Sequence, residues 1–126
     1  MESKNNMKNN KKYYIGEYEK DSPEHHGWFV GKFMNGARKT DEVEIKYHQG
    51  ILLGHKTKVS NTYECDIVID GEMGGHVDNK PVTISKGEYI VIPPGVPNNL
   101  AAHTTKNLKV FTIKAPSDPT AKKVIE

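Results

Sequence analysis

The segment Gly87-Glu-Tyr-Ile-Val-Ile-Pro93-Pro94-Gly95 places a turn, a short apolar strand and a rigid loop within nine residues. A glycine permits the positive φ that a tight turn needs, and proline fixes φ in the loop that follows the strand. About twenty residues upstream, Glu64 lies in a second apolar run that ends at Gly71. Both segments predict short strands closed by tight turns.

The rest of the chain also alternates short β-type runs with turn residues. An apolar period of about 3.6 residues, which an amphipathic helix needs, nowhere persists for three turns. Turn signals about every 8–12 residues are typical of an all-β sandwich or barrel. We expect strands at residues 13–15, 27–34, 42–48, 63–70, 81–85, 88–92 and 107–115, a loop at 22–26, and a chain that leads through 72–77 into a turn at 78–80.

Composition suggests the domain boundaries. Residues 1–12 contain four lysines, one glutamate and no apolar run that could be buried, so we expect a disordered, solvated leader. A single β-barrel domain is expected over residues 13–116. Residues 117–126 are expected to form a C-terminal tail.

Charge and cysteine content exclude several classes of protein. The formal net charge is +2, of which the leader contributes +3, so the domain itself is close to −1. A body without a basic stripe predicts no nucleic-acid partner, and no apolar run approaches the ~20 residues of a membrane span. The N-terminus lacks the apolar stretch of a secretory signal, and Cys65 is the only cysteine. We therefore expect a cytoplasmic protein without an intramolecular disulfide.

The segments at 64–71 and 87–95 together resemble the two signature motifs of the cupin superfamily. The resemblance covers roughly residues 50–115 and implies an all-β double-stranded β-helix, the cupin jelly-roll barrel. The stretches GWFVGKFM (27–34), RKTDEVEIKY (38–47) and VFTIKAPS (110–117) are similar to those of small, single-domain bacterial cupins of unassigned function.

Cupin metal sites take two histidines and a glutamate from the first motif and one histidine from the second. Such nitrogen and oxygen ligands suit Fe(II), Mn, Ni or Zn. In this sequence, Asn98 stands where the second-motif histidine belongs, and Lys58 and Ser60 stand where the first two belong. Only Glu64 matches the family pattern, so we expect no cofactor.

An emptied metal site is therefore our first hypothesis, but the alternative stays open. If a metal is present, Glu64 and His55 are the first candidates as its ligands. Asp66 or His103 would then complete the set.

Strand alternation sends Asp66 and Val68 to the same side as Glu64. Two carboxyl groups close together in an apolar barrel should raise the pKa of one of them. They would then form an acid–base pair or a site for hydroxyls and amines. The competing interpretation is an ion pair between one carboxylate and a nearby cation, Lys56, Lys58 or Arg38.

The candidate site residues follow from this reasoning. We assign possible catalytic roles to His55 and Glu64, since His55 can carry a proton near neutral pH. The candidates for ligand binding are Asp66, Tyr89, Asn98 and His103. Arg38 is the only arginine; either it clamps a carboxylate or phosphate, or it forms a surface ion pair with Asp41 or Glu42.

These observations predict a cupin that binds a small polar molecule in the barrel mouth, at a degenerate, metal-free site. A metal-independent isomerase or epimerase acting on a sugar-like substrate is the alternative, and a metal-dependent dioxygenase is disfavoured by the lost ligands. Whether the protein is an enzyme stays open at this point, because cupins host many functions. A homodimer is expected, because it would cover an open sheet edge.

Overall fold

The computed structural model describes residues 12–52, 55–118, 120 and 122–124 of the chain. The predicted leader therefore lies outside the described residues, except for Lys12. The strands of the described part are β1 (Trp28–Val30), β2 (Glu44–Gln49), β3 (Lys58–Ser60), β4 (Tyr63–Asp70), β5 (Glu72–Val77), β6 (Lys80–Ser85), β7 (Tyr89–Ile92), β8 (His103–Thr104), β9 (Lys109–Ala115) and β10 (Lys122–Val124). Short helical turns precede the first two strands, at α2 (Tyr18–Asp21), η1 (Ser22–His25) and η2 (Gly36–Arg38). No described helix is long and apolar enough to cross a membrane.

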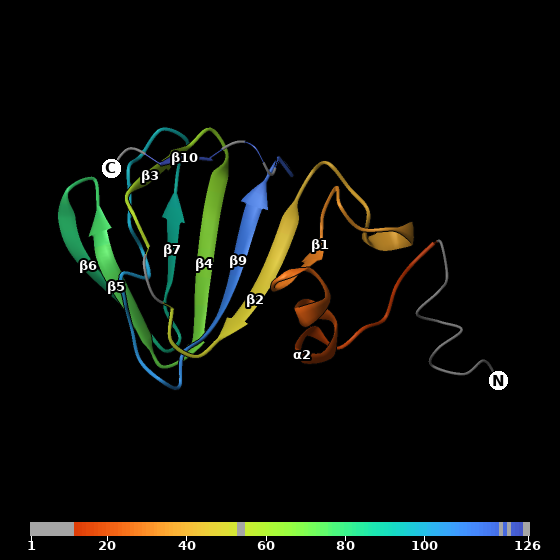
Figure 1. Ribbon diagram of the computed structural model, residues 1–126, viewed down its shortest axis with the longest axis horizontal. Coiled ribbons are helices and arrows are strands. Elements are labelled where there is room, and N and C mark those ends of the chain that lie inside the picture. Colours follow the sequence, from red (N-terminus) through yellow and green to blue (C-terminus); the bar gives the residue numbers. More distant parts are fainter. Residues whose placement is uncertain (1–11, 53–54, 119, 121, 125–126) are drawn as a thin grey trace.

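The strands form a large sheet in the order β1-β2-β9-β4-β7, a sheet in the order β6-β5-β8, and the pair β10-β3. All the pairings are antiparallel. The late strand β9 lies between β2 and β4, so segments far apart in sequence are neighbours (Figure 1). In the same view, β5 and β6 lie at one end of the molecule and α2 lies beside β2 at the other. The prediction of an all-β fold is confirmed.

A single apolar core lies between the two larger sheets. Strands β4, β7 and β9 contribute Val68, Ile92 and Val110, and β5 and β6 contribute Met73 and Ile84. The remaining members of the core come from loops and are Leu100, Ala101 and Leu108. Burial of each large aliphatic side chain stabilises the fold by about 1.5–3 kcal/mol, so this core holds the sheets face to face.

The predicted alternation along β4 is confirmed. Glu64, Asp66 and Val68 are buried, whereas the residues between them are half-buried on the other face of the sheet. Two carboxyl groups and a valine therefore share the inner face of one strand. This strand carries the polar centre of the barrel.

The glycines of the two motifs occupy the turns that the sequence predicts. Gly71 follows β4 with φ +70°, and Gly87 precedes β7 with φ +86°. At Gly71 a Cβ atom would also come within 2.7 Å of the Leu108 Cα atom. Glycine is therefore required there both for its backbone conformation and for close packing of two chain segments.

The structure corrects the predicted strands in three places. Residues 13–15 form no strand, and the strand expected at 27–34 ends at Val30. The chain turns back at Gly31, whose N–H donates to Arg38 O and whose carbonyl accepts from Thr40 N. Residues 72–77, expected to lead into a turn, form β5, which pairs with β6 and β8. A Cβ atom added at Gly75 would lie 2.5 Å from Asn99 O, so glycine allows Asn99 to pack close to this strand.

The domain also extends beyond its predicted end at residue 116. Ser117 is buried, and its hydroxyl donates to Glu44 Oε2 at 3.1 Å and accepts from Lys32 N at 3.0 Å. Further along, β10 pairs with β3 through the backbone. Backbone pairing of this kind leaves no pattern in the side chains, which is why the sequence suggested only a tail.

Candidate functional site

A cavity of about 100 Å³ lies inside the barrel, against the inner face of the large sheet. Its apolar side is formed by Leu52, Met73, Leu100, Ala101 and Val110. Its polar side is formed by Trp28, Lys46, His48, His55, Lys58, Glu64, Asp66, Thr112 and Lys114. A small cavity with an apolar side and converging polar groups has the character of a ligand site.

The register of the large sheet brings the polar residues together. Lys46 on β2, Thr112 on β9 and Asp66 on β4 lie in one row across the three strands. Lys114 and Glu64 lie opposite each other in an adjacent row. Residues directly opposite on antiparallel strands have Cβ atoms about 4.5–5.5 Å apart, so residues from three separate segments line one wall.

Asp66 is the most deeply buried ionisable group of this wall, with a relative exposure of 1%. Burial, the hydrogen bond with Glu64 and the negative charge of Glu64 raise the pKa of Asp66 well above its usual value. The hydrogen bond from Thr112 and the charge of Lys58 act in the opposite direction but are outweighed. Asp66 is therefore the member of the acidic pair that takes up a proton first as the pH falls.

Glu64 is the ionised member of the pair. Burial by itself would raise the pKa of Glu64, but the hydrogen bond from Asp66 and the charges of Lys58 and Lys114 hold that pKa below its usual value. The opposite shifts of Glu64 and Asp66 describe one proton held by two carboxyl groups.

Hydrogen-bond geometry is consistent with this assignment. Thr112 Oγ1 donates to Asp66 Oδ1, while no described group donates to the buried Asp66 Oδ2. An ionised Asp66 would leave Oδ2 without a partner, which is costly in a protein interior. A proton on Oδ2 removes this problem, because Oδ2 can then donate to the Glu64 carboxylate.

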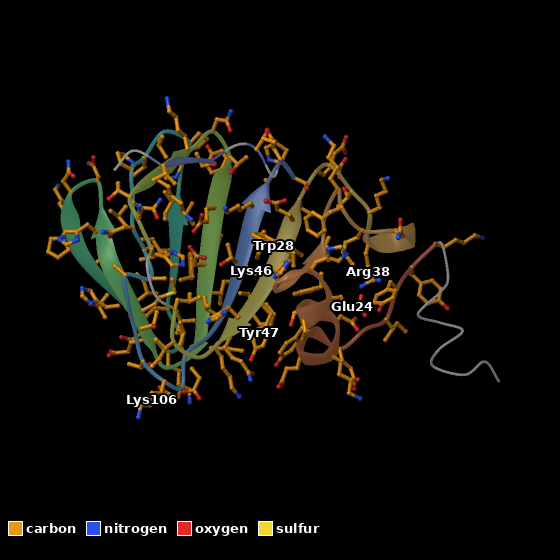
Figure 2. The ribbon with its side chains drawn as sticks, viewed as in Figure 1. Glu24, Trp28, Arg38, Lys46, Tyr47 and Lys106 are labelled. Carbon is orange, nitrogen blue, oxygen red and sulfur yellow. The ribbon has the colours of Figure 1, made fainter. Side chains whose placement is uncertain are left out.

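Three lysines make the cavity wall positive. Lys58 Nζ and Lys114 Nζ lie 3.7 Å and 3.8 Å from Glu64 Oε1. Lys46 Nζ and Lys114 Nζ each lie 5.6 Å from the centre of the Trp28 ring, within the range of cation–π attraction. With Asp66 protonated, three ammonium groups face a single carboxylate charge in this wall. Figure 2 shows Trp28 and Lys46 close together beside β2.

His48 adds a neutral polar group to the same wall. Burial is the main reason that the pKa of His48 lies below its usual value, although the hydrogen bond to Gly50 opposes it. His48 Nε2 lies 3.1 Å from Gly50 O. A carbonyl oxygen only accepts, so Nε2 carries the proton and donates.

The residues of this site do not fit a divalent metal ion. Among the described residues, no three His, Cys, Asp or Glu side chains are grouped closely enough to hold one. Lys58 and Lys114 place two ammonium groups within 4 Å of Glu64, the one residue that matches the family's metal-ligand pattern. A cation bound to Glu64 would be repelled by both.

Of the six candidate residues chosen from the sequence, three line the cavity: His55, Glu64 and Asp66. Tyr89 does not, because it lies opposite Ile67 on the outer face of the sheet and is 68% exposed. His103 is exposed on β8 and lies opposite Gly74, also away from the barrel cavity.

Asn98 is buried but does not line the cavity either. Its side-chain Oδ1 accepts from Leu100 N at 3.2 Å, and its backbone exchanges two 2.9 Å hydrogen bonds with Lys58. The position of the family's second-motif histidine is thus occupied by a residue that supports the backbone of Lys58. Tyr89, Asn98 and His103 thus do not line this cavity, and their roles in ligand binding stay predictions.

Sequence reasoning missed Trp28, Lys46, Thr112 and Lys114. The sequence of β9 contained a usable signal. Thr112 and Lys114 are two and four residues after the apolar Val110, so all three side chains point to the same face of the strand. Lysine is almost never fully buried without a partner, so a lysine in a strand by itself gives no signal of an inward direction. The inward direction of Lys46 follows only from its pairing with Thr112.

The family model described as "Cupin domain" matches residues 54–114. No curated protein matches the sequence.

Three solved structures illustrate the similarity of fold. An RmlC-like cupin family protein with a double-stranded β-helix fold from Methanocaldococcus jannaschii is 26% identical, with a TM-score of 0.54 over 62% of this chain and 73% of that one. A variant of Streptomyces PAC13 solved with uridine is 10% identical, with a TM-score of 0.61 over 79% of this chain and 77% of that one. KdgF from a Halomonas species is 13% identical, with a TM-score of 0.53 over 64% of this chain and 74% of that one.

The predicted jelly-roll barrel is therefore confirmed. The match over residues 54–114 and the shared strand arrangement identify that part of the chain as a cupin domain with the double-stranded β-helix fold.

Proposed function

We propose that the protein binds a small organic carboxylate inside the barrel without the help of a metal ion. The observation that carries this proposal is the presence of three lysine side chains in the wall of a small, partly open cavity. Lys46, Lys58 and Lys114 contribute three ammonium groups, and the Glu64–Asp66 pair contributes one negative charge. These ammonium groups would attract a small anion into the cavity.

Size and polarity narrow the class of ligand. A cavity of about 100 Å³ is smaller than the ~300–1,000 Å³ of sites for drug-sized molecules. The occupant is a molecule of a few heavy atoms, or one end of a longer molecule. The protonated carboxyl of Asp66 can donate to a ligand oxygen, and the side chains of Met73 and Val110 can contact its carbon atoms. A short hydroxy or keto acid combines these features.

Calorimetric titration with lactate and pyruvate tests the proposal, with lactamide as the neutral control. We expect the acids to bind and the amide not to bind. Lys114→Met should weaken binding at least tenfold, whereas Glu64→Gln should strengthen it by removing the competing negative charge. The exposed Lys80→Met serves as the matched control and should leave binding unchanged. Equal affinity of wild type and Lys114→Met, or no binding of either acid, would overturn the proposal.

A second candidate function is proton transfer on the bound acid, as in isomerases and epimerases. It is favoured by the single proton held between Glu64 and Asp66, beside His55, in the same cavity. Incubation with lactate in heavy water followed by NMR would show deuterium at the α-carbon. Asp66→Asn should abolish this exchange while lactate binding persists; absence of exchange in the wild type would exclude this candidate.

A further inference from the structure

A second cavity, of about 510 Å³, lies on the opposite face of the large sheet from the barrel site. It is bordered by Tyr14, Tyr18, Phe29, Arg38 and Phe111. Strand β9 contributes to both sites, because Thr112 faces the barrel cavity and Phe111 faces this one. We call the second cavity the outer cleft. Its volume falls within the ~300–1,000 Å³ typical of sites for small ligands.

The outer cleft has an aromatic wall that is already packed in place. The rings of Tyr18 and Phe111 have centroids 4.9 Å apart in an edge-to-face arrangement, and those of Phe29 and Phe111 are 6.4 Å apart. Tyr47, buried beneath them, contacts both Tyr18 and Phe111. Edge-to-face contacts of this kind hold rings in fixed orientations. A flat apolar group can therefore pack on this wall without rearranging it.

Arg38 supplies a positive charge at the edge of the outer cleft. Two of its guanidinium nitrogens, Nε and Nη1, are buried and have no hydrogen-bond partner among the described residues. The ion pair with Asp41 or Glu42 that the sequence allowed is not found in the described part of the chain. Instead, the guanidinium lies 4.2 Å from the centre of the Tyr14 ring. Arg38 is half-buried. N–H groups that are withdrawn from water without an acceptor are costly, and an anion in the adjoining cavity would accept hydrogen bonds from them.

Two acidic groups lie near Tyr14: Asp21, which lines the cleft, and Glu24, whose charge also acts on the phenol. Asp21 is buried, and its Oδ2 accepts a 3.0 Å hydrogen bond from Tyr14 Oη. Burial and this hydrogen bond raise the pKa of Tyr14, so the phenol stays neutral and adds no charge. Asp21 still repels negative charge, which favours an occupant with one charge over a doubly charged one.

We propose that the outer cleft binds a small aromatic carboxylate, with its ring on Tyr18, Phe29 and Phe111 and its charge beside Arg38. Arginine suits this role because its planar guanidinium both hydrogen-bonds to carboxylates and stacks on aromatic rings. Figure 2 shows Arg38 toward the N-terminal segment, apart from Trp28 and Lys46 of the barrel site. The cleft is thus separate from the proposed function, and either site can exist without the other.

The single arginine of the chain makes a direct test possible. In protein labelled with ¹⁵N, the Nε–H group of Arg38 gives the one arginine side-chain signal of this type in an NMR spectrum. Titration with phenylacetate should shift that signal in a saturable manner, whereas phenylacetamide should not shift it. Phenyl phosphate, with more negative charge, should bind more weakly than phenylacetate. If phenylacetate does not change the chemical shift of the Arg38 signal, the wild-type titration by itself overturns the proposal.

Variants then separate the two sites. Arg38→Gln and Tyr18→Ala should each weaken phenylacetate binding at least tenfold, and Arg38→Lys should retain part of the affinity. Lys58→Gln, in the barrel wall, should leave phenylacetate affinity unchanged. If phenylacetate instead binds equally to wild type and Arg38→Gln, or loses affinity only in Lys58→Gln, the acid binds in the barrel and the outer cleft is not its site.

Discussion

Thr112 Oγ1 donates a 2.5 Å hydrogen bond to Asp66 Oδ1, across the pairing of β4 with β9. This contact engages one oxygen of the carboxyl group and leaves the other, Oδ2, as the position for a proton. Glu64, two residues away on the same inner face, is the acceptor available to that proton. The protonation of the site therefore depends on the register of two strands that are distant in sequence.

Replacement of Asp66 with asparagine is expected to remove a pH dependence of stability. Burial and Glu64 raise the pKa of Asp66 in the folded protein, so the folded chain keeps a proton that the unfolded chain releases above about pH 4. The free energy of unfolding of the wild type therefore falls as pH rises through the window between the unfolded and the folded pKa.

The Asp66→Asn variant keeps a neutral side chain of the same shape and lacks this fall. Its free energy of unfolding should therefore rise relative to that of the wild type as the pH rises. We expect a gain of about 1.4 kcal/mol for each pH unit between the pKa of Asp66 in the unfolded chain and its pKa in the folded chain. Urea unfolding at pH 4, 6 and 8 measures the difference, with the exposed Asp78→Asn as the matched control. Parallel pH profiles for wild type and Asp66→Asn would contradict the assignment of the proton to Asp66.

Thr112→Val removes the hydroxyl group while keeping the shape of the side chain. It leaves the buried Asp66 Oδ1 without its donor, and we expect a loss of about 1–3 kcal/mol in the free energy of unfolding. The pKa of Asp66 should rise further, because the lost hydrogen bond lowers it. Carbon-detected NMR titration of the Asp66 carboxyl measures this shift. Thr112→Ser should restore wild-type behaviour, and an unchanged pKa in Thr112→Val would count against the contact.

Alanine substitutions at two turn glycines are expected to differ in severity. Gly71 and Gly87 both have positive φ, so each substitution carries a backbone cost of about 1–2 kcal/mol. Only at Gly71 would the new Cβ also collide with backbone, that of Leu108, whereas at Gly87 it would meet open space. Thermal or urea unfolding should therefore show a clearly larger loss for Gly71→Ala than for Gly87→Ala. Equal losses would show that the contact with Leu108 relaxes without cost.

A homodimer remains our expectation for the assembly. Strand β7 ends the large sheet, and its outer face exposes Tyr89 and Val91, next to the exposed Tyr63 of β4. An open strand edge beside apolar side chains favours pairing with a second copy. Light scattering at micromolar concentration should give twice the chain mass, and Val91→Lys should shift it toward one chain mass. A wild-type monomer under these conditions would rule the homodimer out.

The strand β4 shows what local sequence can establish. The alternation of Tyr63–Asp70 and the glycine that follows predicted its bounds, its buried face and the proximity of Glu64 and Asp66. The family motifs likewise located the turns at Gly71 and Gly87. These properties depend on side-chain period and on backbone conformation, which neighbouring residues impose on one another directly.

The charge of the barrel site was decided by the tertiary structure. The sequence offered Lys58 only as one of three possible cations and gave no reason to place Lys46 or Lys114 beside Glu64. Their ammonium groups meet there because β2, β9 and β4 pair in one register. The same holds for Asn98, whose position along the chain matched a ligand position but whose backbone is bound to Lys58.

Arg38 shows most clearly the difference between what the sequence determines and what the tertiary structure decides. The sequence identified it as the only arginine and as a possible anion clamp, but nearby acids offered an equally simple partner. Folding of the N-terminal segment against the outer face of the sheet places Tyr14 on the guanidinium and an aromatic cleft beside it. Residue type determines which interactions a side chain can form. Which of them it does form depends on segments brought together by non-local burial and backbone pairing, and no short stretch of sequence encodes those.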